Sequence, residues 1–219
     1  MPLKAVLFDM DGVIVDTEPI HKKAYFKMFE SFGADVDEEL YSTFAGASTR
    51  KVCNTVIDRF GLKDPVEKLE EVKRTLFKKY FYNDSEFDMV PGVSELIAHY
   101  YGNNIKMVLA TSASHTTIDM VFERFDLKPF FNDVISGTDL KESKPNPEIF
   151  LKAAKLSGES AEQCMVIEDS TNGITAAHRA GIFCAGYNGG KTKLQDYSLA
   201  DIVVTDFREL ELQKLKPYF

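Results

Sequence analysis

The sequence has few cysteines, and they are far apart. Cys53, Cys164 and Cys184 form no CxxC pair and show no other spacing typical of a disulfide framework or a metal site. An odd number of dispersed cysteines is typical of small buried apolar side chains in a reducing compartment. We therefore expect a cytoplasmic protein without disulfides.

Long apolar runs and an excess of basic residues are also absent. The apolar run at 5–8 ends at Asp9, well short of the roughly 7–15 apolar residues of a signal-peptide core, and no run approaches the roughly 18 that cross a membrane. The chain has 34 acidic and 26 basic residues, a net charge of -8, whereas affinity for nucleic acid comes from clustered Lys and Arg. We expect neither membrane nor nucleic acid as a partner.

Short apolar segments alternate with longer amphipathic ones over most of the 219 residues. Segments typical of strands buried on both faces of a sheet are 5–8, 107–110, 134–135, 165–167, 182–185 and 202–204. Between them, apolar residues spaced three or four apart predict helices at 94–101, 116–125, 147–156 and 173–180. This order predicts an α/β fold with a Rossmann-like parallel sheet and helices on both of its faces.

The stretch at 17–87 departs from this pattern because it contains no strand signal. Apolar residues fall on one helical face in each of three segments, near 20–32, 52–60 and 66–80. Gly33 and Gly61 end the first two segments. We therefore predict a small α-helical domain at 17–87, inserted into an α/β core that consists of 1–16 and 88–219.

Carboxylates directly follow the first predicted strand. The segment 8–19 reads FDMDGVIVDTEP, so Asp9 and Asp11 stand two residues apart and Gly12 follows. In open parallel sheets ligands bind at the carboxyl ends of the strands, which puts Asp9 at the mouth of a site. Two acids in one turn can divide the work, one as nucleophile or metal ligand and the other as acid/base. The alternative is an ordinary strand-to-loop turn that is acidic.

Further polar groups follow other predicted strands or precede a helix. Thr111 and Ser112 follow 107–110, Lys144 precedes a predicted helix, and Glu168 and Asp169 follow 165–167. Each has a plainer explanation, as a helix N-cap, a solvated loop lysine, or acids placed favourably at a helix N-terminus. Together they supply carboxylates for a hard cation, a hydroxyl donor and a cation for phosphate oxygens, which is what phosphoryl transfer requires.

With these motifs in this order, the sequence resembles the haloacid dehalogenase superfamily of phosphotransferases, in the β-phosphoglucomutase-like branch with a helical cap inserted after the first strand. The motifs are DMDGV at 9–13, the strand end at Thr111, KPNPEIF from Lys144 and IEDS at 167–170. The resemblance covers essentially the whole chain. Dehalogenases of the superfamily typically lack the second acid of the first motif, whereas this chain has Asp11, so phosphate-ester chemistry is the better match.

The resemblance implies a role for each acid of these motifs. Asp9 resembles the nucleophile that attacks phosphorus and becomes an aspartyl phosphate, and Asp11 resembles the general acid/base. Mg²⁺ would be held by Asp9, the Asp11 carbonyl and Asp169. Glu168 would be a further ligand or would orient a metal-bound water.

The same resemblance implies that Thr111, Ser112 and Lys144 hold the oxygens of the phosphoryl group. The cation would offset the repulsion between a carboxylate and a phosphate dianion, and Lys144 would neutralise charge on the equatorial oxygens.

Residues at the start of the predicted cap match positions near the family's hinge and substrate contacts. Thr17 and His21 resemble a Thr and a His of β-phosphoglucomutase-like sequences and could help to control Asp11, and Glu18 lies between them. The plainer alternatives are an exposed histidine in a first helical turn and, for Glu18, a favourable charge at a helix N-terminus.

The segment GASTR, from Gly46 to Arg50, resembles the cap's specificity loop, and Ser48 also fits a helix N-cap. In the mutase a basic residue directly follows the Ser and holds a second phosphate. Here Arg50 stands one residue later, which rotates the side chain by about 100° on a helix. Arg50, Lys73 and Arg74 are all candidate substrate contacts, and a solvated helix face is the alternative for Lys73 and Arg74.

The resemblance therefore implies a Mg²⁺-dependent phosphatase that acts on a small phosphorylated metabolite such as a sugar phosphate. A lysine of the mutase is replaced here by Ser114, which favours hydrolysis. β-Phosphoglucomutase is the alternative, since the two enzymes share their catalytic residues and differ in whether water or a sugar hydroxyl accepts the phosphoryl group. A non-catalytic protein that binds a phosphorylated ligand is a remote third reading. A monomer is our default expectation.

Overall fold

The structure is a computed structural model that describes residues 2–44, 47–190 and 195–219. The chain divides into two compact units, one of Met1–Asp16 with Asp88–Phe219 and one of Thr17–Phe87. We call them the core unit and the helical unit.

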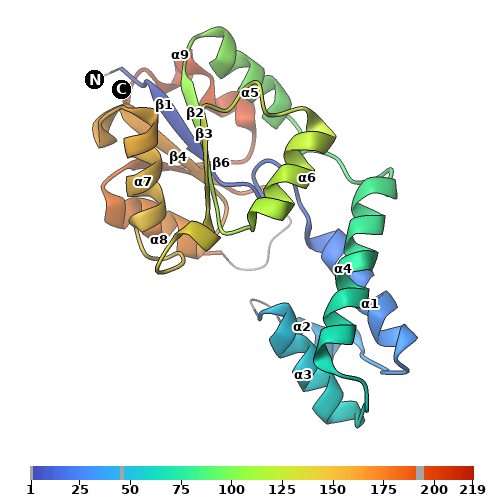
Figure 1. Ribbon diagram of the computed structural model, residues 1–219. Helices are drawn as coiled ribbons and strands as arrows, with labels where there is room; N and C mark the ends of the chain where they lie inside the picture. The colour runs from blue at the N-terminus through green and yellow to red at the C-terminus, as the bar shows by residue number, and fades with distance from the viewer. Residues whose placement is uncertain (1, 45–46, 191–194) are drawn as a thin grey trace. The chain divides into compact units, whose positions relative to one another are not determined.

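The elements of the core unit are β1 (Ala5–Phe8), α5 (Val93–Gly102), β2 (Lys106–Thr111), α6 (His115–Phe125), β3 (Asp133–Ser136), η1 (Gly137–Asp139), α7 (Glu148–Ser157), η2 (Ala161–Gln163), β4 (Cys164–Glu168), α8 (Thr171–Ala180), β5 (Phe183–Tyr187), β6 (Ile202–Val204), η3 (Phe207–Leu210) and α9 (Leu212–Leu215). Those of the helical unit are α1 (Glu18–Ser31), α2 (Glu38–Ser42), α3 (Thr49–Phe60) and α4 (Val66–Asn83) (Figure 1).

The strands described in the core unit form one parallel sheet in the order β3-β2-β1-β4-β5-β6. In the middle of the sheet, Phe8 of β1 pairs with Leu109 of β2 and with Ile167 of β4. Every residue of β1 and β4 is buried, which explains their nearly continuous apolar sequences. The predicted Rossmann-like parallel sheet is confirmed.

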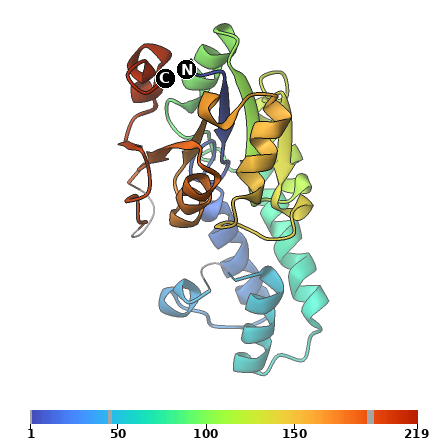
Figure 2. The same cartoon turned by 90° about the vertical axis from the view of Figure 1, so that its left-hand side faces the viewer.

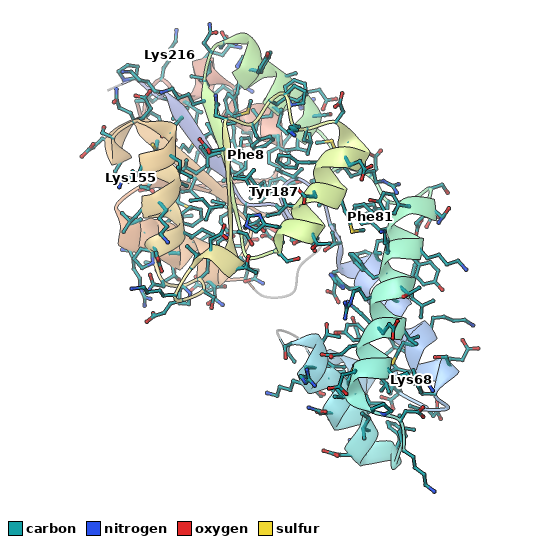
Figure 3. The ribbon with its side chains drawn as sticks, in the orientation of Figure 1. Phe8, Lys68, Phe81, Lys155, Tyr187 and Lys216 are labelled. Atoms are coloured by element: carbon teal, nitrogen blue, oxygen red, sulfur yellow. The ribbon has the colours of Figure 1, made fainter. Side chains whose placement is uncertain are left out.

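Helices cover both faces of this sheet (Figures 1 and 2). On one face, α7 and α8 pack with side chains of the strands in one apolar core. On the other face, the Phe8 ring contacts Tyr100 of α5 and Phe131, with centroid distances of 6.3 and 5.7 Å. Figure 3 shows Phe8 inside the core unit, whereas Lys155 and Lys216 lie on its exposed surface. This packing buries β1 on both faces of the sheet and so fixes the position at which the residues after β1 begin.

The helical unit has its own apolar core, formed by residues of α1, α3 and α4 together with Ala34 and Val36. The sequence predicts these three helices but not α2, which has five residues and no buried side chain. A helix of five residues is too short for its apolar residues to repeat at a helical spacing. It begins where the Asp37 side chain accepts a hydrogen bond from the Leu40 amide at 2.7 Å. That this unit is a cap and the other a catalytic core stays a prediction.

Within the described residues, no helix combines the length and the apolar content that crossing a bilayer requires.

Candidate active site

Asp9 stands where the central strand ends. Its amide donates to the Ile167 carbonyl at 3.0 Å, which extends the β1–β4 pairing by one residue. Its side chain is almost completely buried. Since the neighbouring strands are parallel to β1, their carboxyl ends lie at the same edge of the sheet. The polar residues that follow them are therefore neighbours of Asp9.

A tight turn follows Asp9 and places its backbone against Asp169. The Met10 carbonyl accepts hydrogen bonds from the amides of Ile14 and Val15 at 2.8 and 3.1 Å. Gly12 has a φ of 87°, which favours glycine. A Cβ on Gly12 would lie 2.0 Å from Oδ2 of Asp169. The glycine after the two acids is thus needed both for the turn and for the close approach of the Asp169 carboxylate.

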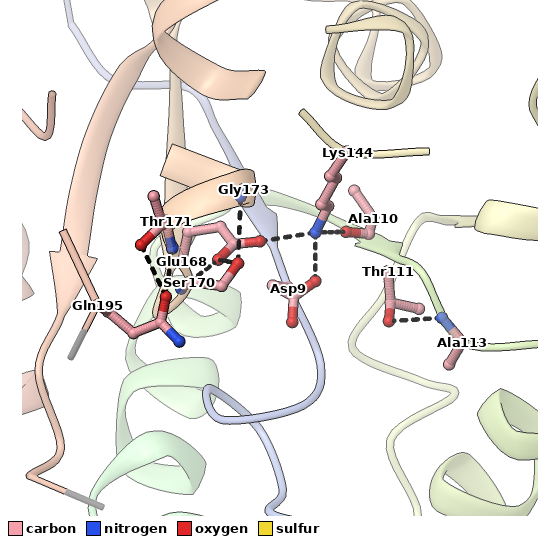
Figure 4. A network of polar contacts seen from close by, with 10 residues as sticks. All are labelled: Asp9, Ala110, Thr111, Ala113, Lys144, Glu168, Ser170, Thr171, Gly173 and Gln195. Carbon is pink, nitrogen blue, oxygen red and sulfur yellow. Dashed lines mark hydrogen bonds and ion pairs between the residues drawn. The ribbon is translucent and has the colours of Figure 1, made fainter. Parts of the chain in front are cut away.

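Lys144 joins the ends of three neighbouring strands. Its Nζ contacts Oδ1 of Asp9, donates to Oε1 of Glu168 at 2.7 Å and donates to the Ala110 carbonyl at 3.1 Å. The Lys144 side chain is only 6% exposed, so the solvated loop lysine considered from the sequence is wrong. Figure 4 shows the other oxygen of Asp9 pointing away from Lys144.

Glu168 is held from both sides. Its second oxygen, Oε2, accepts from the Ser170 amide at 2.8 Å and from the Ser170 hydroxyl at 2.9 Å. Ser170 is in turn the N-cap of α8 and accepts from the Gly173 amide at 3.1 Å. A Cβ on Gly173 would lie 1.7 Å from Oε1 of Glu168. Helix capping and site formation therefore occur in the same short segment, 168–173, and they do not exclude each other.

The charges of this cluster do not balance. Burial, with repulsion from Glu168 and then Asp9, raises the pKa of Asp169 to about 8. Burial also raises the pKa of Asp9, and Lys144 offsets this only in part. Burial lowers the pKa of Lys144, but the two carboxylates beside it outweigh burial and keep it above its ordinary value. One ammonium group thus lies among three buried carboxyl groups. When all three are ionised, their negative charge exceeds the charge of Lys144, so a bound cation would be stabilised here.

The oxygen atoms of this cluster are of the kind that binds a hard divalent cation, but the described side chains are not arranged around a metal site in this structure. Over the described residues, no three His, Cys, Asp or Glu side chains are grouped as a metal site, and Lys144 binds the acids instead. Carboxylate oxygens are the ligands that Mg²⁺ prefers. Asp9 and Asp169, whose pKa values are raised first by burial and then by the neighbouring carboxylates, could hold such an ion together with a backbone carbonyl.

The next polar group at this edge is Thr111, the last residue of β2. Thr111 is 1% exposed, and its Oγ1 accepts from the Ala113 amide at 3.1 Å (Figure 4). Because a hydroxyl has a single hydrogen, this bond leaves the hydrogen of Thr111 available to donate elsewhere. Ser112, which follows it, is exposed. The helix N-cap considered for these two residues is wrong, because Ser114 caps α6.

The candidate residues of the helical unit have partners of their own. Glu18 lies in the first turn of α1 and accepts from the Tyr41 hydroxyl at 3.1 Å. Thr17, the N-cap of α1, is buried. His21 stacks on Phe77 with 4.3 Å between ring centroids, so the exposed histidine considered from the sequence is wrong. Burial, with Lys73 nearby, lowers its pKa to about 3.

The candidates further along the helical unit differ from one another. Ser48 is the N-cap of α3, as the sequence predicts, while Gly46 lies outside the described residues. Arg50 forms ion pairs with Glu67 and Glu70.

Lys73 and its neighbour Arg74 lie on different faces of α4. Lys73 is only 6% exposed, and its Nζ lies 2.7 Å from Nδ1 of His21. The solvated face proposed for Lys73 is therefore wrong. Arg74 is exposed.

Two residues in the site or beside it are not among those predicted from the sequence. Gly173 had a signal, because a glycine in the first turn of a helix costs about 1 kcal/mol relative to alanine and so needs a reason. Gln195 had none. Its Oε1 accepts from both the amide and the hydroxyl of Thr171 at 2.8 Å, 24 residues away in the chain. No pattern in the local sequence predicts such a contact.

Comparison with protein families and curated proteins gives a consistent result. A family model described as haloacid dehalogenase-like hydrolase matches residues 6–187. The chain is 33% identical over 184 residues to a phosphorylated carbohydrates phosphatase of Thermotoga maritima, and the match covers 82% of each protein. It is 29% identical over 218 residues to a β-phosphoglucomutase of Bacillus subtilis, covering 97% of this chain and 94% of the relative.

Solved structures match over nearly the whole chain. A candidate β-phosphoglucomutase from Thermotoga maritima has a TM-score of 0.84 and 30% identity, with 99% of this chain and 100% of that chain covered. CbbY from Rhodobacter sphaeroides, solved in complex with phosphate, has a TM-score of 0.78 and 27% identity, covering 95% and 96%. The sheet with its helical insertion is thus an architecture shared with proteins whose names include phosphatases and phosphomutases.

Proposed function

Because the chain belongs to the haloacid dehalogenase-like hydrolase family, we propose that it is a Mg²⁺-dependent phosphomonoester hydrolase that works through an aspartyl phosphate. Its substrate is a small phosphorylated metabolite, most readily a sugar phosphate, as the name of the phosphatase relative suggests. We propose further that the core unit carries the chemistry, that the helical unit acts as a cap, and that the enzyme is a cytoplasmic monomer.

The observation that carries the proposal is the contact of one buried lysine with two buried acids. Lys144 holds Oδ1 of Asp9 and thereby orients the carboxylate, whose Oδ2 points away from the lysine (Figure 4). A nucleophile must be held in one orientation to reach phosphorus in line with the leaving oxygen. Oδ2 is the oxygen that we assign to the attack.

Binding of the phosphoryl group uses the donors at the same edge. The Thr111 hydroxyl donates to one phosphoryl oxygen, because its own oxygen already accepts from the Ala113 amide. Ser112, exposed beside it, offers a second donor. Lys144, which the acids around it keep protonated, neutralises the charge that spreads over the equatorial oxygens.

The reaction then needs a proton at two moments. When Oδ2 of Asp9 bonds to phosphorus, the ester oxygen leaves with the electrons of the P–O bond, and Asp11 gives it a proton. Asp11 then takes a proton from water as that water attacks the aspartyl phosphate, which frees inorganic phosphate and restores Asp9. Mg²⁺, held by Asp9, the Asp11 carbonyl and Asp169 with Glu168 beside it, would shield the attacking carboxylate from the phosphate dianion.

The choice of substrate falls to the cap in this proposal. The candidate residues are Thr17, Glu18, His21, Gly46, Ser48 and Arg50. Arg50 already has two acidic partners, which weakens the case that it binds a second phosphate. That favours a monophosphate substrate.

β-Phosphoglucomutase is the second candidate, because a curated relative of that name matches 97% of this chain. In that case a sugar hydroxyl takes the place of water as acceptor. Since the same residues would serve both reactions, only the product distinguishes them.

A panel of phosphomonoesters with Mg²⁺, read by released phosphate, tests the proposal. We expect release from at least one sugar monophosphate, and activity should disappear with EDTA. Conversion of β-glucose 1-phosphate to glucose 6-phosphate without release would establish the mutase instead. A protein that binds esters but turns over none would be a binding protein.

The Asp9→Asn variant tests the assigned nucleophile. It keeps the shape of Asp9 but removes its charge, so we expect a loss of turnover of at least about a thousandfold, the scale on which removal of a covalent nucleophile acts. Near wild-type turnover by this variant would overturn the mechanism.

A further inference from the structure

The turn after β3 forms polar contacts with the turn after β2. The turn after β2 is the one that follows the proposed phosphate-binding residues Thr111 and Ser112. Ser136, the last residue of β3, donates its hydroxyl hydrogen to the Ala113 carbonyl at 2.6 Å. Beyond it, Nε2 of His115 lies 2.8 and 3.0 Å from the two carboxylate oxygens of Asp139. The two turns therefore meet at an inner, buried contact and an outer, exposed one.

Ala113 connects Ser136 to Thr111. The Ala113 amide donates to Oγ1 of Thr111 at 3.1 Å, while its carbonyl accepts from Ser136. The direction in which Thr111 presents its hydrogen depends on where the Ala113 amide lies. Ser136 fixes the peptide that follows this amide in the chain, so it acts on Thr111 through a single residue.

Ser136 is itself held without freedom to turn. It is 0% exposed, its oxygen accepts from the Thr138 amide at 3.1 Å, and it lies 2.7 Å from the Thr138 hydroxyl. Its amide donates to the Asp139 carboxylate at 3.1 Å. With its one hydrogen given to Ala113, the Ser136 hydroxyl has every capacity in use.

The same turn also meets the backbone of Ser112. A Cβ on Gly137 would lie 2.9 Å from the Ser112 carbonyl oxygen and 3.0 Å from its Cα. Even a methyl group there would push Ser112 away. Thr111 and Ser112 are thus both located by residues that have no place in the reaction itself.

We propose that Ser136 is a positioning residue for phosphate binding, which sets the Thr111 hydroxyl through Ala113. This inference rests on the proposed function, in which Thr111 donates to the phosphoryl group. Asp9 and Asp169 extend from other strands, β1 and β4. Loss of the Ser136 hydroxyl should therefore weaken phosphate binding. The Mg²⁺ concentration at half-maximal rate should stay unchanged.

Ser136→Ala, compared with Ser157→Ala, separates positioning from general stability. Ser157 is also buried and donates to an alanine carbonyl, that of Ala154, at 2.7 Å. It lies near Lys106 at the amino end of β2, far along the strand from Thr111. The two variants lose the same kind of hydrogen bond, and only Ser136 contacts the turn that holds phosphate.

The measurements are KM for the best ester, the inhibition constant of inorganic phosphate, the Mg²⁺ concentration at half-maximal rate, and the melting temperature. For Ser136→Ala we expect KM and the phosphate constant to rise about fivefold to tenfold, the effect of one hydrogen bond. The Mg²⁺ response should not change. Ser157→Ala should lower the melting temperature as much as Ser136→Ala does, while KM and the phosphate constant stay at their wild-type values. In Ser136→Cys, whose thiol is a weak donor, both constants should lie between those of wild type and Ser136→Ala.

Two failures are distinguishable. If wild-type protein neither hydrolyses an ester nor binds inorganic phosphate, the proposed function is wrong, and this inference with it. If wild-type protein binds phosphate and Ser136→Ala binds it equally well, only the inference is overturned. Should Ser136→Ala not fold, Ser136→Cys tests the same contact, because it keeps a side chain at this position with a weaker donor, and a phosphate constant equal to that of wild type overturns the inference too.

Discussion

Each of the two units buries a lysine, but the surroundings of the two lysines differ in charge. Lys144 of the core unit lies between the carboxylates of Asp9 and Glu168. Lys73 of the helical unit has Nδ1 of His21 at 2.7 Å, and its ammonium lies over the ring of Tyr25 at 4.7 Å. One lysine is neutralised by acids, and the other is held by a neutral imidazole and aromatic faces.

The difference shows what sets the charge of a buried amine. Burial lowers the pKa of both lysines. For Lys144 the adjacent carboxylates reverse the effect, whereas for Lys73 burial prevails and the pKa falls to about 8. The core unit thus maintains a permanent positive charge, and the helical unit holds one that is lost at mildly alkaline pH.

Removing the acid-paired lysine should have the largest effect. Lys144→Met leaves Asp9 and Glu168 without their buried partner, which costs about 3–5 kcal/mol for a buried ion pair that loses one member. The charge that we propose to neutralise phosphate is lost as well, so we expect kcat/KM to fall at least about a hundredfold. Phosphate release and thermal unfolding measure the two effects.

Lys152→Met is the matched control, since Lys152 pairs with Glu148 at 2.8 Å on an exposed part of α7. An exposed pair contributes only about 0–1 kcal/mol. Equal losses in the two variants would mean that burial among acids gives Lys144 no special role.

Removing one acid from the same cluster should act through the metal. Asp169→Asn takes away a proposed ligand, so the Mg²⁺ concentration at half-maximal rate should rise at least about tenfold. In the absence of metal and at pH 9, above the pKa of about 8 of Asp169, the variant should unfold at a temperature no lower than wild type, because a buried like charge is removed. Asp133→Asn, at the opposite end of the sheet, should behave as wild type. An unchanged Mg²⁺ response in Asp169→Asn would exclude Asp169 as a ligand.

Removing the other lysine should change stability and its pH dependence. Folding lowers the pKa of Lys73 from 10.5 to about 8 and that of His21 from 6.5 to about 3. The unfolded chain therefore binds more protons in both windows, so stability should rise with pH between about 8 and 10.5 and fall as pH drops from about 6.5 to 3. In Lys73→Met the alkaline rise should disappear, and the melting temperature at pH 7 should increase by a few degrees.

Calorimetry at pH 5, 7 and 9.5 would measure this, with Arg74→Met as control on the exposed side of α4. Since Lys73 also lowers the pKa of His21, the acid limb should become shallower in Lys73→Met. A Lys73→Met variant with an unchanged pH profile would contradict the assignment of a lowered pKa to Lys73.

The same two lysines show how much of the site the sequence can predict. The segment with Lys144 follows a family motif, and the ends of buried strands are visible in the apolar pattern, so Asp9, Thr111 and Glu168 can be assigned to one edge of the sheet from the sequence alone. The fold class follows from the same pattern. The pairing of Lys144 with the acids does not, because 135 residues separate Lys144 from Asp9.

The charge of Lys73 makes its burial hard to predict. The buried residues of α4 are Leu69, Lys73, Phe77 and Phe81, each four positions after the last, which is a helical face. The apolar pattern of the sequence instead follows residues 66, 69, 72, 76 and 80, of which only Leu69 belongs to the buried set. Giving the spacing more weight than the charge would have identified the buried lysine, whereas no local pattern would have identified Ser136 or Gln195.

The smallest effect is expected at Arg50, and it tests whether the proposed cap binds a second phosphate. Arg50 is more than half exposed and shared between Glu67 and Glu70, so its positive charge is already offset. Arg50→Ala should change kcat/KM for a sugar monophosphate by less than about twofold and the free energy of unfolding by less than about 1 kcal/mol.

Glu67→Gln, which removes one ion-pair partner of Arg50, tests the opposite change, because it leaves more of the charge of Arg50 available to a ligand. If Arg50 binds a second phosphate, Glu67→Gln should strengthen inhibition by a sugar bisphosphate and Arg50→Ala should abolish that inhibition. Hydrolysis of a monophosphate with no response to either change is the result that a monophosphate phosphatase requires.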